Sequence, residues 1–308
     1  MSAPGVVVLG EANPDLVLRG AEPGVATGQR EVLVDDATLT VGGSGSIFAC
    51  GLARLGVPTT LCAVIGDDPF GRFMLGELES RGVDVSAVSR REDEPTGISV
   101  ILSSRDDRGI YTAPGTTASL LAGDIPDGLL ENARHVHVAS FFLQHALRPA
   151  LPDLLARARG AGATTSLDPN WDPAEGWDDG LLELLEHVDV FLPNGAEVTR
   201  IAGTGDVEAA ARRLAERGPL VVVKCGGDGA LACRDDVLIE AASVGGVPIV
   251  DTTGAGDAFD AGFVRATLEG WPLERALAFA NVCGALSCRA PGGVDGQPTL
   301  EEALALDG

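Results

Sequence analysis

Basic residues are scarce in this chain. Lysine and arginine together number 22, against 45 aspartates and glutamates in 308 residues, which gives a formal net charge of -23. Proteins that bind nucleic acid present clustered basic side chains to the phosphates, so this composition argues against a nucleic-acid partner. Lysine occurs only once, at Lys224. A single lysine indicates a position where arginine does not serve, although codon bias would give the same count.

Long apolar runs are also missing. The longest mainly apolar stretch lies between Arg275 and Arg289 and is interrupted by Asn281 and Ser287, whereas a membrane helix takes about 20 residues. The N-terminus passes into the apolar run at 6–9 without a basic leader or a cleavage site. We therefore predict no membrane span and a cytoplasmic protein.

Neither the cysteines nor the histidines are spaced for a metal. No CxxC pair occurs, and the cysteines lie in apolar segments, as reduced core thiols do: Cys50, Cys62, Cys225, Cys233, Cys283 and Cys288. His135 and His137 alternate along one predicted strand, while His145 and His187 are isolated. A zinc site and a disulfide framework are not supported, and the histidines are expected to be structural.

No repeat, low-complexity tract or linker divides the chain, so we expect one domain over residues 1–308. Apolar residues make up 45% of it, enough for a full core. From about residue 57, short β-branched runs alternate with helical stretches, the runs being 59–65, 136–139, 164–167, 188–192 and 220–223. Apolar strands linked by helices predict a doubly wound α/β fold with a mostly parallel sheet flanked by helices.

Two segments break this rhythm. Residues 12–41 and 96–113 read as antiparallel strands outside the main sheet, and in the second segment two β-branched runs flank a turn at 105–108. We expect these strands to form a small β-flap, or lid, over one edge of the core. An exposed strand edge invites pairing, so the lid is also a candidate surface for a homodimer.

The most informative stretch is the turn Gly254-Ala255-Gly256, which lies between a strand end and an apolar helix. Free N–H groups in the first turn of such a helix, together with the helix dipole, favour an anion. Asp257 adds a carboxylate to the same turn. Taken alone, Asp257 is explained equally well as a first-turn residue that stabilises the helix.

A second glycine-rich turn, over residues 42–46, opens another apolar helix. Neither turn matches GxxxxGK[ST], and neither matches GxGxxG, because Phe48 and Phe259 stand where the third glycine belongs. The sequence therefore contains neither a P-loop nor a dinucleotide-binding fingerprint.

Four stretches together resemble the PfkB carbohydrate kinases, the ribokinase-like family: Gly10 with Asn13 and Asp15, residues 42–56, residues 194–197, and residues 251–259. The likeness covers nearly the whole chain, and the last stretch is highly specific for the family. The resemblance implies a ribokinase-like fold and ATP-dependent phosphorylation of a sugar hydroxyl. It makes Asp257 the general base, with the N–H groups of Gly254, Ala255 and Gly256 holding the transferring phosphoryl oxygens.

The resemblance also implies the nucleotide and metal sites. Asn194 and Glu197 match the element that positions Mg²⁺ through water, and they equally fit a helix N-cap with half of a capping box. Lys224 would lie near the ATP phosphates, and three further residues near the ribose and the adenine: Gly226, Gly229 and Asn281. Asp251 and Thr253 fall where relatives often bind K⁺.

On the acceptor side, four residues match positions that bind sugar hydroxyls: Asn13, Asp15, Gly42 and Gly43. Ile47 departs from the family, which commonly has asparagine there, so one hydroxyl contact is lost unless Ser44 or Ser46 replaces it.

Residues 168–172 are similar to the Asp-x-Asn stretch of fructokinases and 2-keto-3-deoxygluconate kinases, with Asp172 in place of an arginine. The loss of that cation favours a neutral acceptor. An adenosine-type nucleoside kinase stays open as an alternative, because Ile47, Phe48, Phe141 and Phe142 could face a base. A non-catalytic sugar-binding regulator is the other alternative, and the intact set of Asp257, Asn194 and Glu197 argues against it.

Overall fold

The computed structural model describes residues 5–306 apart from 22–23, 25–26, 104–107 and 236. Within these residues the main sheet has the strand order β13-β12-β11-β10-β9-β8-β1-β4-β5. Pairing is parallel from β5 through β11 and antiparallel for β12 and β13 at one edge. The predicted strand runs correspond to β1 (Val6–Leu9), β4 (Thr59–Gly66), β8 (His135–Val138), β9 (Thr164–Leu167), β10 (Val190–Phe191) and β11 (Leu220–Lys224). The sheet also contains β5 (Val88–Arg91), β12 (Ala230–Arg234) and β13 (Val237–Ala241).

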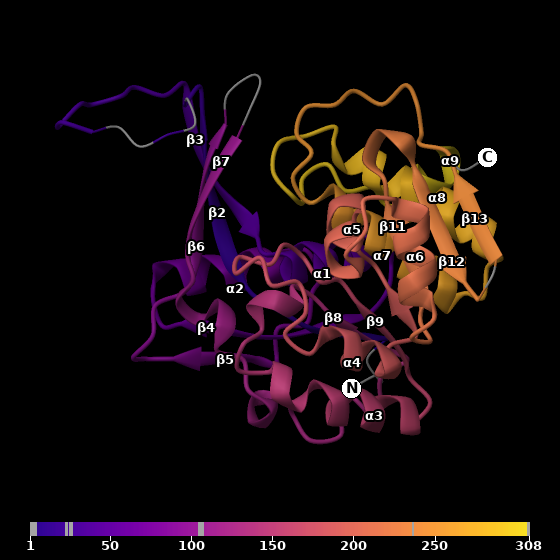
Figure 1. The fold of residues 1–308 in the computed structure, drawn as a ribbon. Coiled ribbons are helices and arrows are strands. Elements are labelled where there is room, and N and C mark those ends of the chain that lie inside the picture. The colour runs from indigo at the N-terminus through magenta and orange to yellow at the C-terminus, as the bar shows by residue number, and fades with distance from the viewer. Residues whose placement is uncertain (1–4, 22–23, 25–26, 104–107, 236, 307–308) are drawn as a thin grey trace.

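Helices cover both faces of the sheet (Figure 1), which confirms the doubly wound α/β prediction. One core cluster lies between the sheet and α3 (Leu151–Gly160), α4 (Leu181–Leu184), α5 (Gly195–Ala202) and α6 (Val207–Ala215). A second core cluster lies on the opposite face under α1 (Ser44–Arg54), α2 (Pro69–Ser80), α7 (Ala255–Leu268), α8 (Leu273–Ser287) and α9 (Leu300–Leu306). Strands buried on both faces explain the continuous apolar runs in the sequence.

The lid is a separate sheet with the strand order β3-β2-β6-β7. Its strands are β2 (Asn13–Arg19), β3 (Asp36–Gly42), β6 (Ile98–Ser103) and β7 (Arg108–Ala113). Residues 22–23, 25–26 and 104–107 of the two predicted lid segments lie outside the described residues. The two hairpins are antiparallel as predicted, but β2 and β6 pair in parallel, because both strands enter the lid from the same side of the core.

Two expected absences concern helices and cysteines. In the described part of the chain, no helix is both long and apolar enough to cross a bilayer. Five of the six cysteines are buried, and Cys225 is partly exposed. His135 and His137 are buried, and burial lowers the pKa of each to about 3. Both rings hydrogen-bond Ser166 at 2.7 Å, so they are neutral structural side chains.

Candidate active site

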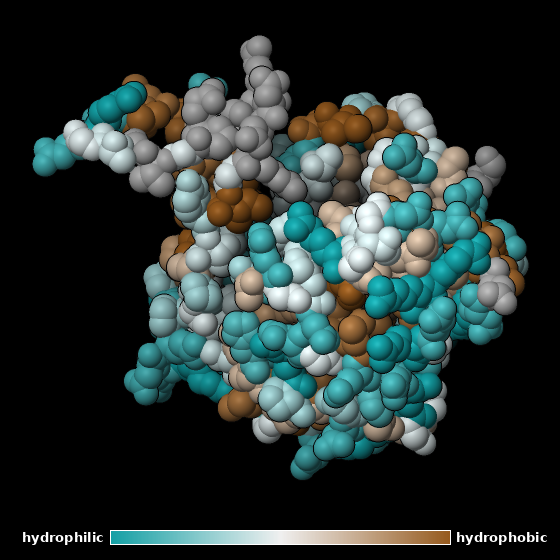
Figure 2. Space-filling view, viewed as in Figure 1, coloured by the Kyte–Doolittle hydropathy of each residue, from teal (hydrophilic) through white to brown (hydrophobic). Residues whose placement is uncertain are grey.

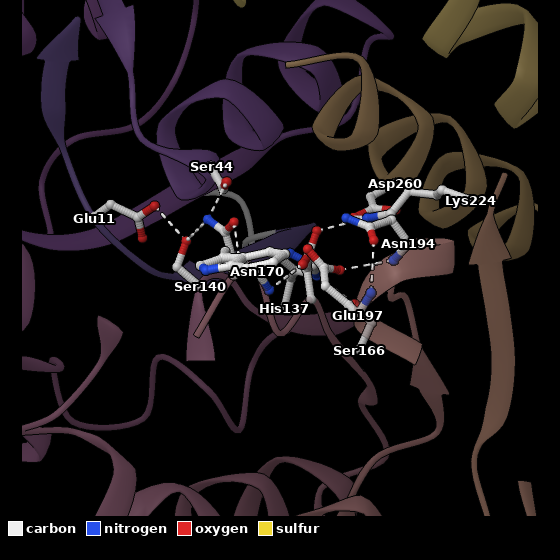
Figure 3. A network of polar contacts seen from close by, with 12 residues as sticks. Glu11, Ser44, His137, Ser140, Ser166, Asn170, Asn194, Glu197, Lys224 and Asp260 are labelled. Carbon is white, nitrogen blue, oxygen red and sulfur yellow. Dashed lines mark hydrogen bonds and ion pairs between the residues drawn. The ribbon is translucent and has the colours of Figure 1, made fainter. Parts of the chain in front are cut away.

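The carboxyl ends of neighbouring parallel strands bring the polar residues of the site together. Glu11 follows β1, Ser140 follows β8, Asn170 follows β9, Asn194 follows β10, and Lys224 ends β11. Figure 3 shows these side chains as one continuous band across the strand ends. In an open α/β sheet this edge is where ligands bind.

Asp257 lies in the first turn of α7, and its side chain is partly exposed. Gly254 caps this helix with φ at 71°, and a Cβ there would lie 2.8 Å from Gly293 Cα, so the turn requires glycine. The Ala255 N–H donates to the Thr252 carbonyl at 3.2 Å. Of the three predicted phosphoryl donors, Ala255 is therefore already engaged.

The pKa of Asp257 is raised well above its ordinary value. Burial is the main cause, and the negative charges of Asp168 and Glu11 add to it. Lys224 and the Ser44 hydroxyl act in the opposite direction. A carboxylate that is costly to ionise is a stronger base, which suits a group that removes a proton from a hydroxyl.

A cavity of about 420 Å³ opens beside the first turn of α7. All the predicted nucleotide-side residues outside the Asn194 element line it, together with two residues of the glycine turn: Lys224, Gly226, Gly229, Asn281, Ala255 and Gly256. The Asn281 amide donates to the carbonyls of Ala241 and Ala242, each at 3.1 Å. Asn281 thus fixes the segment that forms the outer wall of the cavity.

Asn194 and Glu197 form the capping box of α5. The Asn194 side chain accepts from the N–H groups of Ala196 and Glu197 at 2.9 Å, and Glu197 accepts from the Asn194 N–H at 2.8 Å. The structural interpretation of this pair is therefore confirmed. Burial and the charge of Asp168 raise the pKa of Glu197 to about 7.

Lys224 reaches the wall of the cavity, but its ammonium group is held by carboxylates. Nζ lies 2.8 Å from Asp168 Oδ2 and 2.9 Å from Asp260 Oδ2. Burial lowers the pKa of Lys224, yet Asp168, Asp260 and Glu197 outweigh burial and raise it overall. The charge expected to face the nucleotide phosphates is already neutralised by the protein.

The four predicted acceptor residues lie together at the base of the lid. Asn13 pairs with Gly42 in the β2–β3 ladder. A Cβ at Gly42 would lie 2.1 Å from Asp15 Oδ1, and one at Gly43 would lie 2.7 Å from Asn13 Oδ1. The glycines therefore leave room for the two polar side chains. Burial and the nearby Glu11 raise the pKa of Asp15 to about 7.

Of the two serines of α1 that could replace the asparagine that the family has at position 47, Ser46 is excluded by its burial. Ser46 is fully buried, and its hydroxyl donates to the Glu11 carbonyl at 2.9 Å. The Ser44 hydroxyl accepts from the Asn170 amide at 3.2 Å and lies beside Asp257. Ile47 packs against Gly254 and Gly293.

The aromatic residues that motivated the nucleoside alternative are in the core. Phe48 stacks on His137 with ring centroids 3.8 Å apart. Phe141 and Phe142 pack against each other, and the exposed fraction of each of the three phenylalanines is at most 2%. The suggestion that they face a bound base was wrong, because their apolar area is used to cover the sheet.

Asp172 stands where the arginine was expected, and it is also turned inward. Its carboxylate accepts from the N–H groups of Ala174 and Trp177 at 2.9 and 2.7 Å. Asp172 thus fixes the loop after β9 and does not supply charge to the acceptor.

Asp251 and Thr253, the predicted K⁺ residues, hydrogen-bond each other. Asp251 Oδ1 accepts from the Thr253 N–H and hydroxyl, and its Oδ2 accepts from the Gly292 N–H at 2.9 Å. Within the described ranges, no group of three or more His, Cys, Asp or Glu side chains is arranged to hold a metal ion.

Sequence reasoning missed three residues that build the site: Glu11, Ser140 and Asp260. Glu11 is buried and accepts from the Ser140 hydroxyl at 2.7 Å and from Gln144 at 3.2 Å. Asp260 offered a signal, because it is a carboxylate in an otherwise apolar helix three residues after Asp257. Ser140 offered none, since its left-handed φ of 53° is set by its tertiary contacts.

Comparison with known proteins identifies the family. Residues 3–300 match the model of the pfkB family carbohydrate kinases. The chain is 34% identical over 282 residues to the 2-dehydro-3-deoxygluconokinase of Bacillus subtilis (strain 168), covering 86% of this chain and 85% of that protein.

Solved structures share the fold. The Arabidopsis thaliana ribokinase complexed with ribose and ATP superposes with a TM-score of 0.87 at 25% identity, over 99% of both chains. A putative ribokinase II from E. coli in complex with ATP and Mg²⁺ has a TM-score of 0.84 at 25% identity, over 98% of both chains. The chain belongs to the pfkB family of carbohydrate kinases and is an ATP-dependent sugar kinase.

Proposed function

We propose that this enzyme transfers the γ-phosphoryl group of ATP to a hydroxyl group of a neutral sugar, with Asp257 as the general base. The observation that carries the proposal is the position of Asp257. It lies in the first turn of α7, next to Gly256 of the 420 Å³ cavity, and its carboxylate hydrogen-bonds Ser44, which directly follows the acceptor residues Gly42 and Gly43.

The chemistry follows from this position. Asp257 removes the proton from the acceptor hydroxyl, whose oxygen attacks the γ-phosphorus while the bond to the leaving ADP oxygen breaks. The N–H groups of the turn at Gly254 and Gly256 stabilise the charge on the phosphoryl oxygens. Asn13 and Asp15 bind the acceptor hydroxyls, which fixes the attacking oxygen in line.

Mg²⁺ fits this site when it is held through water. The carboxylate of Glu197 and the amide of Asn194 offer oxygen ligands, the type that Mg²⁺ prefers. Both side chains already hydrogen-bond the backbone in the capping box, which favours contact with the ion through water over direct contact. When bound, the ion neutralises phosphate charge. By the same reasoning, Asp251 and Thr253 would hold K⁺ beside the turn at Gly292.

The acidic surroundings favour a neutral acceptor. Burial, Glu11 and Asp251 raise the pKa of Asp15, and burial, Asp168 and Glu11 raise that of Asp257, so carboxyl groups are clustered on this side of the site. A carboxylate or phosphate on the acceptor would be repelled. This sets the proposal apart from the acidic sugar in the name of the Bacillus subtilis relative.

The variant Asp257→Asn tests the role of the base. We expect turnover to fall by about 10³-fold, at the level of a lost general base, with ATP affinity and unfolding temperature unchanged. The matched control is Asp206→Asn, because asparagine also serves as the N-cap that Asp206 provides for α6. Wild-type turnover of Asp257→Asn would remove Asp257 as the base.

An acceptor panel tests the substrate class. We expect phosphorylation of ribose or fructose and none of 2-keto-3-deoxygluconate or adenosine. Activity on the acidic sugar alone would overturn the neutral-acceptor proposal, and activity on adenosine alone would replace it with a nucleoside kinase. Sugar binding by calorimetry without ADP formation would favour a regulator.

We also propose a homodimer through the lid. Figure 2 shows exposed apolar side chains on the lid, where Leu33 is 85%, Ile110 54% and Tyr111 46% exposed. Burial of this surface against a second copy removes apolar area from water. Light scattering at working concentration measures the mass, and a monomer would reject the dimer.

A further inference from the structure

The buried charge cluster around Lys224 has no place in the chemistry described so far. Its ammonium group lies between Asp168 and Asp260, and the exposed fractions of the three side chains are 11%, 9% and 1%. The three residues come from the end of β11, the loop after β9 and the second turn of α7. Figure 3 shows Lys224 and Asp260 at one end of the polar band.

Asp260 has an oxygen without a partner. Oδ2 accepts from Lys224, but the buried Oδ1 receives no hydrogen bond from the described residues. Asp168 has donors on both oxygens, the Asn170 N–H at 2.8 Å and Lys224, so it keeps its charge. A proton on Asp260 Oδ1 would satisfy that atom by donating to the adjacent Asp168, which leaves one cation, one anion and one neutral acid.

We propose that Lys224, Asp168 and Asp260 are positioning residues, which hold the first turns of α7 against the ends of β9 and β11 and so fix the Asp257 carboxylate. Asp257 and Asp260 are three residues apart on one helix, so they lie on the same side in successive turns. The Lys224 side chain runs beneath the turn, since a Cβ at Gly256 would lie 3.6 Å from its Cδ and Nζ.

This inference rests on the proposed function, because it assigns the task of holding the base. It also gives Lys224 a partner other than the nucleotide phosphates. The groups that face Asp257 are Asp168, Lys224, Glu11 and Ser44. Of the charged ones, only Lys224 favours the ionised base.

Three single variants test the proposal, with Asp260→Asn as the conservative partner of Asp260→Leu. Asparagine mimics the neutral acid and can donate to Asp168, so we expect turnover within about threefold of wild type. Asp260→Leu and Lys224→Met remove the link, and we expect turnover to fall about 100-fold, at the level of misplaced catalytic groups. Affinity for a non-hydrolysable ATP analogue, measured by calorimetry, should stay within about threefold in all three.

A pH profile separates positioning from a purely structural role. Lys224→Met should move the acidic limb of the kcat profile to higher pH, because the cation that favours the charged base is gone. Asp260→Asn should leave the limb in place. If neither variant moves it and both keep wild-type turnover, the proposal is overturned.

A charge-balanced double variant controls for misfolding. Lys224→Met combined with Asp168→Asn removes one cation and one anion together, which avoids an unpaired buried charge. We expect it to fold, to bind the ATP analogue and to remain slow. A loss of analogue affinity of tenfold or more with turnover retained would instead assign Lys224 to the phosphates. An inactive Asp257→Asn beside a fully active Lys224→Met would reject this inference alone, and an active Asp257→Asn would reject the proposed function.

Discussion

The acceptor side and the nucleotide side of this kinase are built from different materials. At the base of the lid, the walls are buried polar side chains, with Glu11 2%, Asn13 5% and Asp15 6% exposed. Across the turn of α7, the walls of the cavity are mostly glycine, small side chains and main chain. The acceptor side is shaped by charge and hydrogen bonds, and the nucleotide side by the volume that small residues leave open.

This difference teaches where each kind of selectivity resides. In the proposed function, buried carboxylates would fix the direction of acceptor hydroxyls, and their charge depends on pH. Main chain and glycine do not titrate, so nucleotide binding should be less sensitive to pH and more sensitive to added volume. The turn at Gly254 belongs to both sides, and damage there should affect both.

The largest effect is expected for Gly254→Ala. The new Cβ would lie 2.8 Å from Gly293 Cα and 2.9 Å from Ile47, at a φ of 71° that alanine disfavours. Displacing the donors of the turn should lower kcat about 10²- to 10³-fold in steady-state assays. The matched control is Gly76→Ala in α2, where a Cβ meets nothing within 4 Å. Turnover equal to wild type would show that the turn does not stabilise the phosphoryl group.

Gly42→Ala should weaken sugar binding and leave ATP binding unchanged. The Cβ would lie 2.1 Å from Asp15 Oδ1, so that carboxylate must move. We expect KM for the sugar to rise about 50-fold, the size of an overpacked site, and KM for ATP to stay unchanged. Equal rises in both constants would mean that the two sides are not independent.

Asn281→Ala should break the nucleotide side alone. It removes two hydrogen bonds to the carbonyls of Ala241 and Ala242, which hold the outer wall of the cavity. The loss should weaken ATP binding about 20-fold by calorimetry, with KM for the sugar unchanged. An unchanged ATP affinity would show that this wall is held by other contacts.

The pH dependence should divide the two sides in the same way. Burial and Glu11 raise the pKa of Asp15 to about 7, so the charged form that accepts two hydroxyl protons appears as pH rises through 7. KM for the sugar should fall about tenfold from pH 6 to pH 8, and KM for ATP should change little. Asp15→Asn should abolish the slope, and a slope that survives would place its origin elsewhere.

The same pKa shift lowers the stability of the folded protein as pH rises, whereas it strengthens sugar binding. The folded pKa of Asp15 is raised above its ordinary value of 3.8. Its contribution to stability is therefore fully present below that value and is lost as pH rises through about 7. From pH 5 to pH 8, the unfolding temperature of the wild type should therefore fall relative to that of Asp15→Asn.

The two sides also differ in how far the sequence predicts them. The proposed acceptor residues Gly42 and Asp15 were named from the resemblance to the family, and the fold brings them together, since a Cβ at Gly42 would lie 2.1 Å from Asp15 Oδ1. Gly226 and Gly229, which are proposed for the nucleotide side, were also named from the resemblance, and both line the cavity.

Contacts between distant segments were not predictable. The Asp260 side chain meets Lys224 and Asp168 only after β9, β11 and α7 have been placed next to one another. The burial of Phe48 and Phe141 was missed because a single aromatic residue gives no indication of which way its strand or helix faces. The parallel pairing of β2 with β6 likewise depends on how the two hairpins leave the core.

A single lysine allows amine-directed labelling to report on one side chain of this protein. Acylation, reductive methylation and lysine-directed crosslinking can modify one ε-amine in this chain, that of Lys224. It lies against the first turn of α7. Peptide mass spectrometry after brief labelling would separate modification of Lys224 from that of the α-amine of the chain, and the rate at Lys224 would report how often this part of the site opens to solvent.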